Sequence, residues 1–140
     1  MRGSFPGATE YVTPAIEICG SRIAGWDIRI TDTISDNASA GLVVLGKTRI
    51  KPVLDDLPRV SMAVQHGGAT VAEGRGEACL GNPALAVAWL GQMLTHLGRG
   101  LRAGDIVMSG AMAKMVAAEP GSNFAVNFGN LGTVRVQFGV

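Results

Sequence analysis

Short runs of apolar residues dominate the hydrophobic pattern of this chain, and their spacing favours strands over helices. Residues 14–19 predict a strand entered at Pro14, because proline cannot donate a hydrogen bond inside a sheet, and Gly20 ends the run. Residues 42–46 are a continuous apolar run with the length of a buried strand. Further strands are predicted at residues 60–64, 69–72, 106–108, 124–128 and 133–138.

Glycine-rich segments between these runs predict tight connections. Residues 65–68, with the sequence Gln-His-Gly-Gly, predict a hairpin turn, because two glycines supply the positive φ angles that such turns need. Residues 129–132 predict a second hairpin before the last strand. Residues 36–41 and the proline-containing residues 47–59 are predicted connections. Residues 27–35 have no clean period, and their conformation stays open.

One segment shows helical spacing. Asn82 can cap a helix, Pro83 suits its first turn, and Gly98 suits its end, so a helix is predicted over about 82–97. Its apolar positions are Ala86, Trp89, Leu90, Met93, Leu94 and Leu97. Strands outnumber helices, which predicts an α+β, mainly β roll with one long helix packed outside. We expect a flexible leader over residues 1–10 and a single domain over residues 11–140.

Composition narrows the class of protein. A chain of 140 residues that is 47% hydrophobic and 16% charged predicts one soluble domain, and no run approaches the roughly 20 apolar residues needed to span a membrane. The 12 basic and 11 acidic residues are scattered, which argues against nucleic acid or an anionic membrane as a partner. Cys19 and Cys79 lie far apart without a metal-binding motif, which favours a reducing cytoplasm.

Acidic residues are the strongest candidates for chemistry. Glu17 lies in an otherwise apolar strand, where it either points to solvent while Ile16 and Ile18 point inward, or is paired or bound to a metal ion. Asp32 and Asp36 are four residues apart, so on a helix they would share a face and need a magnesium ion or an arginine between them. The alternative for this pair is a solvated turn that caps backbone amides.

Other motifs give little support for catalysis. Residues 74–79 resemble a glycine-rich dinucleotide fingerprint, but Cys79 stands where that fingerprint needs glycine or alanine. The chain has neither a Ser-His-Asp order nor a Gly-x-Ser-x-Gly elbow, so acyl transfer has no support.

Four motifs in order carry a family resemblance. They are residues 14–18 with 21–23, residues 32–39 (Asp-Thr-Ile-Ser-Asp-Asn-Ala-Ser), residues 78–83 with 88–90, and residues 103–111 (Ala-Gly-Asp-Ile-Val-Met-Ser-Gly-Ala). From about Tyr11 to its end, the chain resembles the bacterial 2-keto-4-pentenoate hydratase and 4-oxalocrotonate decarboxylase family of the fumarylacetoacetate hydrolase superfamily.

The resemblance implies a mixed β-roll that binds magnesium or manganese and acts on small 2-hydroxy- or 2-oxo-dienoates from aromatic catabolism. Glu17 matches the third carboxylate ligand of the metal ion. Ser39 matches a position that faces the substrate carboxylate, and Ser109 and Gly110 match a loop that closes over the metal site, although many relatives have threonine in place of this serine. No catalytic residue is assigned with these matches.

The chain departs from the family in length. Family members are nearly twice as long, and their Glu-x-Glu metal pair, with a lysine and an acidic residue implicated in proton transfer, precedes the matched segment. Three alternatives follow: half of an enzyme that works with a separate N-terminal half, a binding or interaction module without turnover, or a piece of an ordinary hydratase. Each predicts exposed apolar surface and therefore an oligomer or a second segment as partner.

Overall fold

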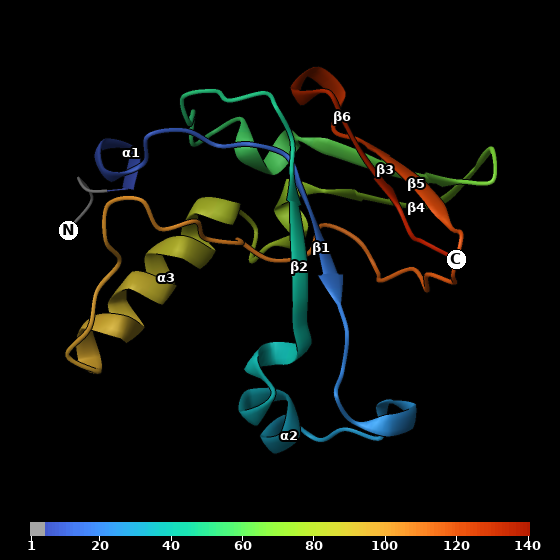
Figure 1. Cartoon of the computed structure of the whole chain (residues 1–140). Helices are drawn as coiled ribbons and strands as arrows, with labels where there is room; N and C mark the ends of the chain where they lie inside the picture. The colour runs from blue at the N-terminus through green and yellow to red at the C-terminus, as the bar shows by residue number, and fades with distance from the viewer. Residues whose placement is uncertain (1–4) are drawn as a thin grey trace.

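Two antiparallel sheets form the body of the fold. The computed structural model describes residues 5–140. A two-stranded sheet pairs β1 with β2, and a four-stranded sheet has the order β4-β3-β5-β6 (Figure 1). The strands are β1 (Ala15–Cys19), β2 (Ala40–Leu45), β3 (Ser61–His66), β4 (Ala69–Arg75), β5 (Asn123–Asn127) and β6 (Thr133–Gln137).

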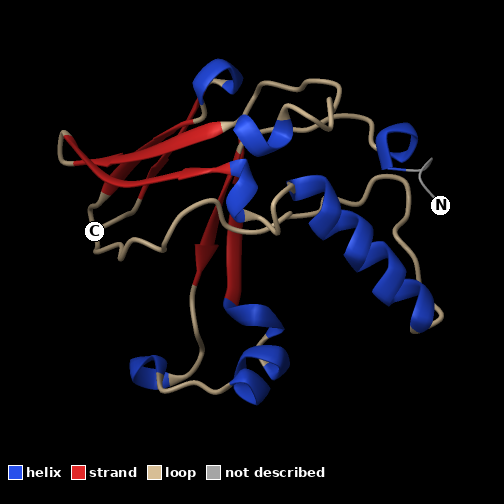
Figure 2. Ribbon diagram, turned by 180° about the vertical axis from the view of Figure 1, so that it is seen from behind, coloured by secondary structure: helices blue, strands red, loops and turns tan. Residues whose placement is uncertain are grey.

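Helices are short, with one exception. The α-helices are α1 (Phe5–Ala8), α2 (Ile30–Ser35) and α3 (Pro83–His96). Five 3-10 turns are η1 (Ala24–Trp26), η2 (Asn37–Ser39), η3 (Leu57–Arg59), η4 (Gly76–Ala78) and η5 (Gly129–Leu131). In Figure 2, α3 lies on the opposite side of the molecule from the turn between β3 and β4.

The core lies where the two sheets meet. Its buried residues are Val126, Phe128, Leu131 and Val134, and Ile16 of β1 and Val44 of β2 pack against them. Ile16 and Val44 are also paired across the small sheet, so one rung of that sheet reaches the core. The rest of the small sheet extends away from the body and ends beside α2 (Figure 1).

The joint between the sheets requires a glycine. A Cβ atom at Gly46 would lie 2.7 Å from Cγ of Pro14 and 3.1 Å from Cγ2 of Val134. The N–H of Gly46 donates to the carbonyl of Pro14 at 2.8 Å. The chain therefore leaves β2 in close contact with both the start of β1 and the core.

The turn between β3 and β4 is tighter than the sequence predicts. Gly67 and Gly68 alone form it, with φ angles of 58° and 82°. His66 belongs to β3 rather than to the turn: its Nδ1 lies 2.8 Å from the carbonyl oxygen of Asn123, and its ring stacks on Phe124. Pairing with β5 on the other side of β3 thus extends the strand beyond the predicted end.

The predicted long helix is present, but its apolar residues lie on two faces. Asn82 accepts a hydrogen bond from the N–H of Ala84 at 2.9 Å, as expected for a cap. Trp89, Met93 and Leu97, predicted to face the core, are exposed, and Trp89 is 57% exposed. Leu85 is exposed as well, so these four side chains form an exposed stripe at i, i+4 spacing.

The predicted fold class is confirmed, and one predicted strand is wrong. The structure is α+β, mainly β, with one long helix packed against the outside. Residues 106–108 are not a strand, because no described segment pairs with their backbone. Residues 30–35 of the open segment form α2. Residues 1–4 of the predicted leader lie outside the described residues, and residues 5–8 form α1.

No helix among the described residues is long and apolar enough to cross a membrane.

Replacement of one leucine in the core is predicted to destabilise the chain far more than the same change on α3. Leu131 is 7% exposed and Leu85 is 59% exposed. We expect Leu131→Ala to lower the free energy of unfolding by about 2–5 kcal/mol, through lost burial and the cavity left behind. Leu85→Ala, the matched control, should change it by no more than about 0.5 kcal/mol. Urea unfolding measures both, and equal losses would contradict this core assignment.

Candidate metal and carboxylate site

Glu17 lies on the extended part of the small sheet. It pairs with Val43 across the sheet, and its side chain is exposed while the neighbouring Ile16 packs against the core. Glu17 makes no ion pair with another described residue. The side chain therefore points outward from the small sheet, which leaves the carboxylate accessible to a ligand.

The described residues do not complete a metal site around Glu17. No group of three or more His, Cys, Asp or Glu side chains that could hold an ion occurs among them. Cys19 lies two residues along the strand, but burial, and secondarily the charge of Glu17, raise the pKa of its thiol above the ordinary 9.0. Because a protonated thiol is a poor ligand, Glu17 is the donor suited to a hard cation at this position.

A strained turn precedes β2. Asn37, Ala38 and Ser39 have φ angles of 51°, 58° and 55°, so three successive residues other than glycine adopt the left-handed conformation. That conformation costs an L-residue roughly 1–2 kcal/mol, and it normally occurs in single residues. We call these three residues the left-handed turn. Contacts elsewhere in the chain must hold it, because its own backbone preferences oppose it.

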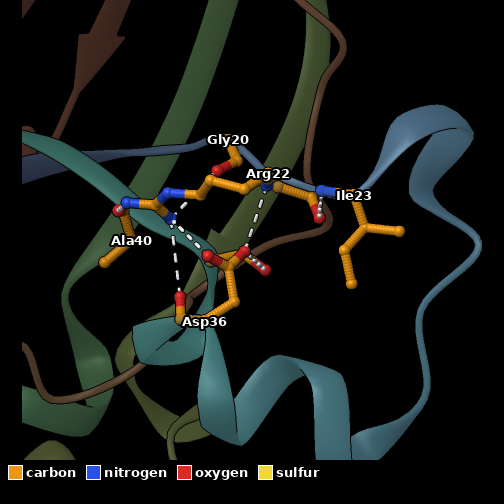
Figure 3. Close-up of polar contacts among 7 residues, drawn as sticks. Gly20, Arg22, Ile23, Asp36 and Ala40 are labelled. Carbon is orange, nitrogen blue, oxygen red and sulfur yellow. Dashed lines mark hydrogen bonds and ion pairs between the residues drawn. The ribbon is translucent and has the colours of Figure 1, made fainter.

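Arg22 holds both ends of the left-handed turn (Figure 3). Its guanidinium donates to the carbonyl oxygens of Gly20 at 3.2 Å, Asp36 at 3.4 Å and Ala40 at 2.8 Å. It also forms an ion pair with the carboxylate of Asp36 at 3.2 Å. The backbone N–H of Arg22 donates to the same carboxylate. The side chain of Asp36 is 15% exposed and that of Arg22 is 56% exposed, so the acidic partner is the more buried one.

The two aspartates considered together in the sequence have separate roles. Asp32 accepts a hydrogen bond from the N–H of Arg29 at 2.8 Å at the start of α2. Asp36 binds Arg22 instead. An arginine is therefore the cation at Asp36, but it does not bridge Asp36 to Asp32. Arg22 is a residue that the sequence analysis did not single out.

Ser39 is buried within the turn. It is 3% exposed, its carbonyl accepts from the N–H of Gly20 at 2.8 Å, and its hydroxyl lies 3.4 Å from the carboxylate of Asp36. That separation is long for a hydrogen bond between oxygens, so the hydroxyl loses little by turning to another acceptor. The N–H groups of Asn37 and Ala38 make no hydrogen bond to any described residue. The turn therefore combines a weakly held hydroxyl with two free backbone donors.

The left-handed turn lies next to the end of the strand that carries Glu17. The N–H of Gly20 bonds to Ser39, and Gly20 is three residues beyond Glu17. At the rise of a strand, three residues span roughly 10 Å.

Ser109 and Gly110 lie in a different environment. They line a cavity of about 400 Å³ together with α3 and the segment before it, and neither Glu17 nor Ser39 lines that cavity. The thiol of Cys79 donates to the carbonyl oxygens of Gly110 at 3.3 Å and Ala111 at 3.4 Å. Gly110 has a φ angle of 117°, a conformation that L side chains rarely adopt. Cys79 thus fixes the loop predicted to close over the site.

Comparison with known proteins identifies the family. Residues 10–138 match the C-terminal domain of fumarylacetoacetate (FAA) hydrolase. The chain belongs to the fumarylacetoacetate hydrolase family. Within it, the chain is similar to one half of a hydratase and of a decarboxylase.

The relatives agree with this assignment. The 2-keto-4-pentenoate hydratase of Paraburkholderia xenovorans is 48% identical over 131 residues, which are 94% of this chain and 49% of that protein. A structure of 4-oxalocrotonate decarboxylase from Pseudomonas putida G7, complexed with magnesium and adipate, has a TM-score of 0.91 at 30% identity and covers 97% of this chain and 52% of that one. A second structure of that decarboxylase, complexed with calcium and acetate, has a TM-score of 0.88 at 30% identity, with 97% and 51% covered.

The chain spans about half the length of the curated relatives it matches. The resemblance inferred from the four sequence motifs is confirmed, including the restriction to the C-terminal half.

The thiol of Cys79 is predicted to make stability depend on alkaline pH. Burial raises the pKa of this thiol above 9.0, so the folded chain holds the proton more tightly than the unfolded chain does. The stabilisation is complete below the unfolded pKa and is lost as pH rises toward the folded one. We expect Cys79→Ser, which keeps a hydroxyl donor but does not titrate there, to flatten the fall in the free energy of unfolding above about pH 8.

Urea unfolding at a series of pH values measures this slope. Cys19→Ser is the comparison, because the Cys19 thiol is less buried and should account for less of the slope. An unchanged slope in Cys79→Ser would rule out the buried thiol as its source.

Proposed function

We propose that this domain forms part of a lyase site that hydrates or decarboxylates small 2-hydroxy- or 2-oxo-dienoates. The observation that carries the proposal is 48% identity to a 2-keto-4-pentenoate hydratase over 94% of the chain, together with the fold of a decarboxylase solved with magnesium and adipate. Two free cysteines in the described chain fit a cytoplasmic location.

Glu17 is our proposed metal ligand. Its carboxylate is exposed, unpaired among the described residues, and of the oxygen type that magnesium and manganese prefer. One carboxylate does not satisfy an ion that wants several oxygens in an octahedron, so water, the bound ligand and a second segment would supply the remaining oxygens. A divalent ion bound there would supply Lewis-acid stabilisation of the negative charge on an enolate.

The left-handed turn is our proposed site for the substrate carboxylate. Its donors are the hydroxyl of Ser39 and the free N–H groups of Asn37 and Ala38, and charge-assisted hydrogen bonds of this kind are shorter and stronger than neutral ones. Ser109 and Gly110 are proposed to cover the substrate from the loop that Cys79 holds. The chain's own groups thus bind and orient, and the proton-transferring groups lie outside it.

The apolar surface supports a partner. The stripe of Leu85, Trp89, Met93 and Leu97 is exposed along α3, and Leu42 and Val43 are exposed on β2 beside Glu17. Large exposed apolar side chains gathered in this way are typical of an interface. We propose that a second segment, either the complementary half of the enzyme or another copy of this chain, covers this surface and completes the site.

Metal binding is predicted to depend on Glu17. Calorimetric titration of the chain with magnesium or manganese should detect binding in the presence of oxalate, a mimic of the 2-oxo acid group. Glu17→Gln should weaken this binding by about tenfold or more, since it removes the charged donor and keeps the shape.

Glu73→Gln, which also alters an exposed strand glutamate, is the control and should bind as the parent does. Equal binding by both variants, or none by the parent even when the upstream half of a hydratase is supplied, would overturn the proposed site.

Association through the α3 stripe is predicted as well. In sedimentation at roughly 20 μM, we expect the chain to form a species larger than the monomer. Trp89→Glu should shift it to the monomer, because the change introduces a charge into the apolar contact. Val71→Glu, at an exposed valine of β4, should leave it unchanged. A monomeric parent would remove self-association and leave the complementary half as the proposed partner.

A further inference from the structure

We propose that Arg22 and Asp36 are positioning residues that set the affinity of the left-handed turn for a carboxylate ligand. The inference rests on the proposed function, since the turn is where the substrate carboxylate is proposed to bind. Neither residue is proposed to touch the substrate. Their effect passes through the conformation and the local charge of Asn37, Ala38 and Ser39.

The conformational argument starts from the strain. None of the three turn residues is glycine, and Ala38 lacks even the local side-chain hydrogen bond that helps asparagine or aspartate adopt positive φ. Left alone, this segment would relax to negative φ. Relaxation would change the relative placement of the two free N–H groups and the Ser39 hydroxyl, since the backbone angles of the turn alone relate them. A carboxylate would then meet a different arrangement of these donors.

The shape of the arginine side chain suits it to prevent this relaxation of the turn. Three carbonyl groups accept from the guanidinium, one just after β1 (Gly20) and one on each side of the turn (Asp36 and Ala40), as Figure 3 shows. A planar fork with several fixed donors can hold such a set, whereas the single ammonium of lysine is a point charge on a flexible stem. Arg22 therefore fixes the turn to the strand that carries Glu17.

The electrostatic argument concerns Asp36. Its carboxylate is largely buried, one residue before the proposed ligand donors, and a negative charge there would repel a carboxylate ligand. The ion pair with Arg22 neutralises it. Loss of Arg22 would thus weaken carboxylate binding in two ways: the turn relaxes, and the negative charge of Asp36 is left unpaired. Loss of the charge on Asp36 leaves the cation in place and removes the repulsion.

These two effects predict a particular order of ligand affinities among the variants. A general loss of stability would not produce that order. We expect oxalate, in the presence of magnesium, to bind Arg22→Ala about tenfold or more weakly than the parent. Asp36→Asn should bind more tightly than Arg22→Ala, and Arg22→Lys should lie between Arg22→Ala and the parent. Arg59→Ala is the matched control, because it removes the exposed ion pair of Arg59 with Asp56 far from the turn.

Nuclear magnetic resonance of the isotope-labelled chain measures both steps. Positive φ brings the N–H proton close to the Hα of the same residue, so the intraresidue cross-peaks of residues 37–39 report the turn directly. Magnesium and oxalate titrations followed at the same amides report binding. We expect Arg22→Ala to lose the strong cross-peaks, and Ala38→Gly in that background to restore part of the affinity, because glycine adopts positive φ without cost.

The outcomes separate this inference from the proposed function. If Arg22→Ala keeps both the cross-peaks and the affinity of Arg59→Ala, the positioning role is wrong while carboxylate binding stands. If the parent shows no response to oxalate even when the upstream half of a hydratase is supplied, the proposed function fails, and the ligand role of this pair fails with it. If Arg22→Ala does not fold, the same comparison is made with Arg22→Lys. Parent-like affinity in Arg22→Lys would show that the planar guanidinium group is not needed, and the positioning role would be wrong.

Discussion

The contact between the two sheets fixes the small sheet, and with it Glu17, on the core of the molecule. An isolated pair of strands is at best marginally stable in water, so the small sheet depends on its one rung, Ile16 and Val44, that packs against the core. Gly46 makes that packing possible, because a side chain there would collide with Pro14 and Val134. Glu17 immediately follows the packed rung, so its position is set by core residues rather than by partners of its own.

A balance of strain and hydrogen bonding governs the other end of the small sheet. The left-handed turn opposes its own backbone preferences, and Arg22 and Asp36 hold it with one ion pair and several hydrogen bonds. A half-exposed ion pair alone contributes little to stability. The carbonyl contacts and the partial burial of Asp36 strengthen this one. Strain maintained by surrounding contacts is common where proteins bind ligands, since it fixes donors before the ligand arrives.

Much of the fold was predictable, because hydrophobic period and turn chemistry are local signals. Asn82 and Pro83 marked the start of α3, and paired glycines marked the turn at Gly67. Residues 106–108 had the composition of a strand, but a strand also needs a neighbour, which a local pattern does not reveal. The prediction that Trp89, Met93 and Leu97 of α3 face the core was wrong for a different reason. Apolar residues cover both faces of this helix, so their spacing does not show which face is exposed.

The candidate site was harder to predict from the residues. The alternation of the strand allowed the outward position of Glu17, and only the family resemblance gave it a role as a ligand. The sequence raised an arginine as partner for Asp36 without indicating which one, because Arg22 lies 14 residues away and is brought near by the pairing of β1 with β2. Asn37, Ala38 and Ser39 include no glycine, so the local sequence does not predict their left-handed backbone.

The two-stranded sheet has a consequence for the protein in the cell. Both of its strands are edge strands, and each presents a row of N–H and C=O groups that face no third strand among the described residues. With Leu42 and Val43 exposed on β2, this edge is a template on which a newly made chain can add a foreign strand and aggregate. Prompt assembly with the proposed second segment would therefore protect the domain during synthesis as well as complete the proposed site.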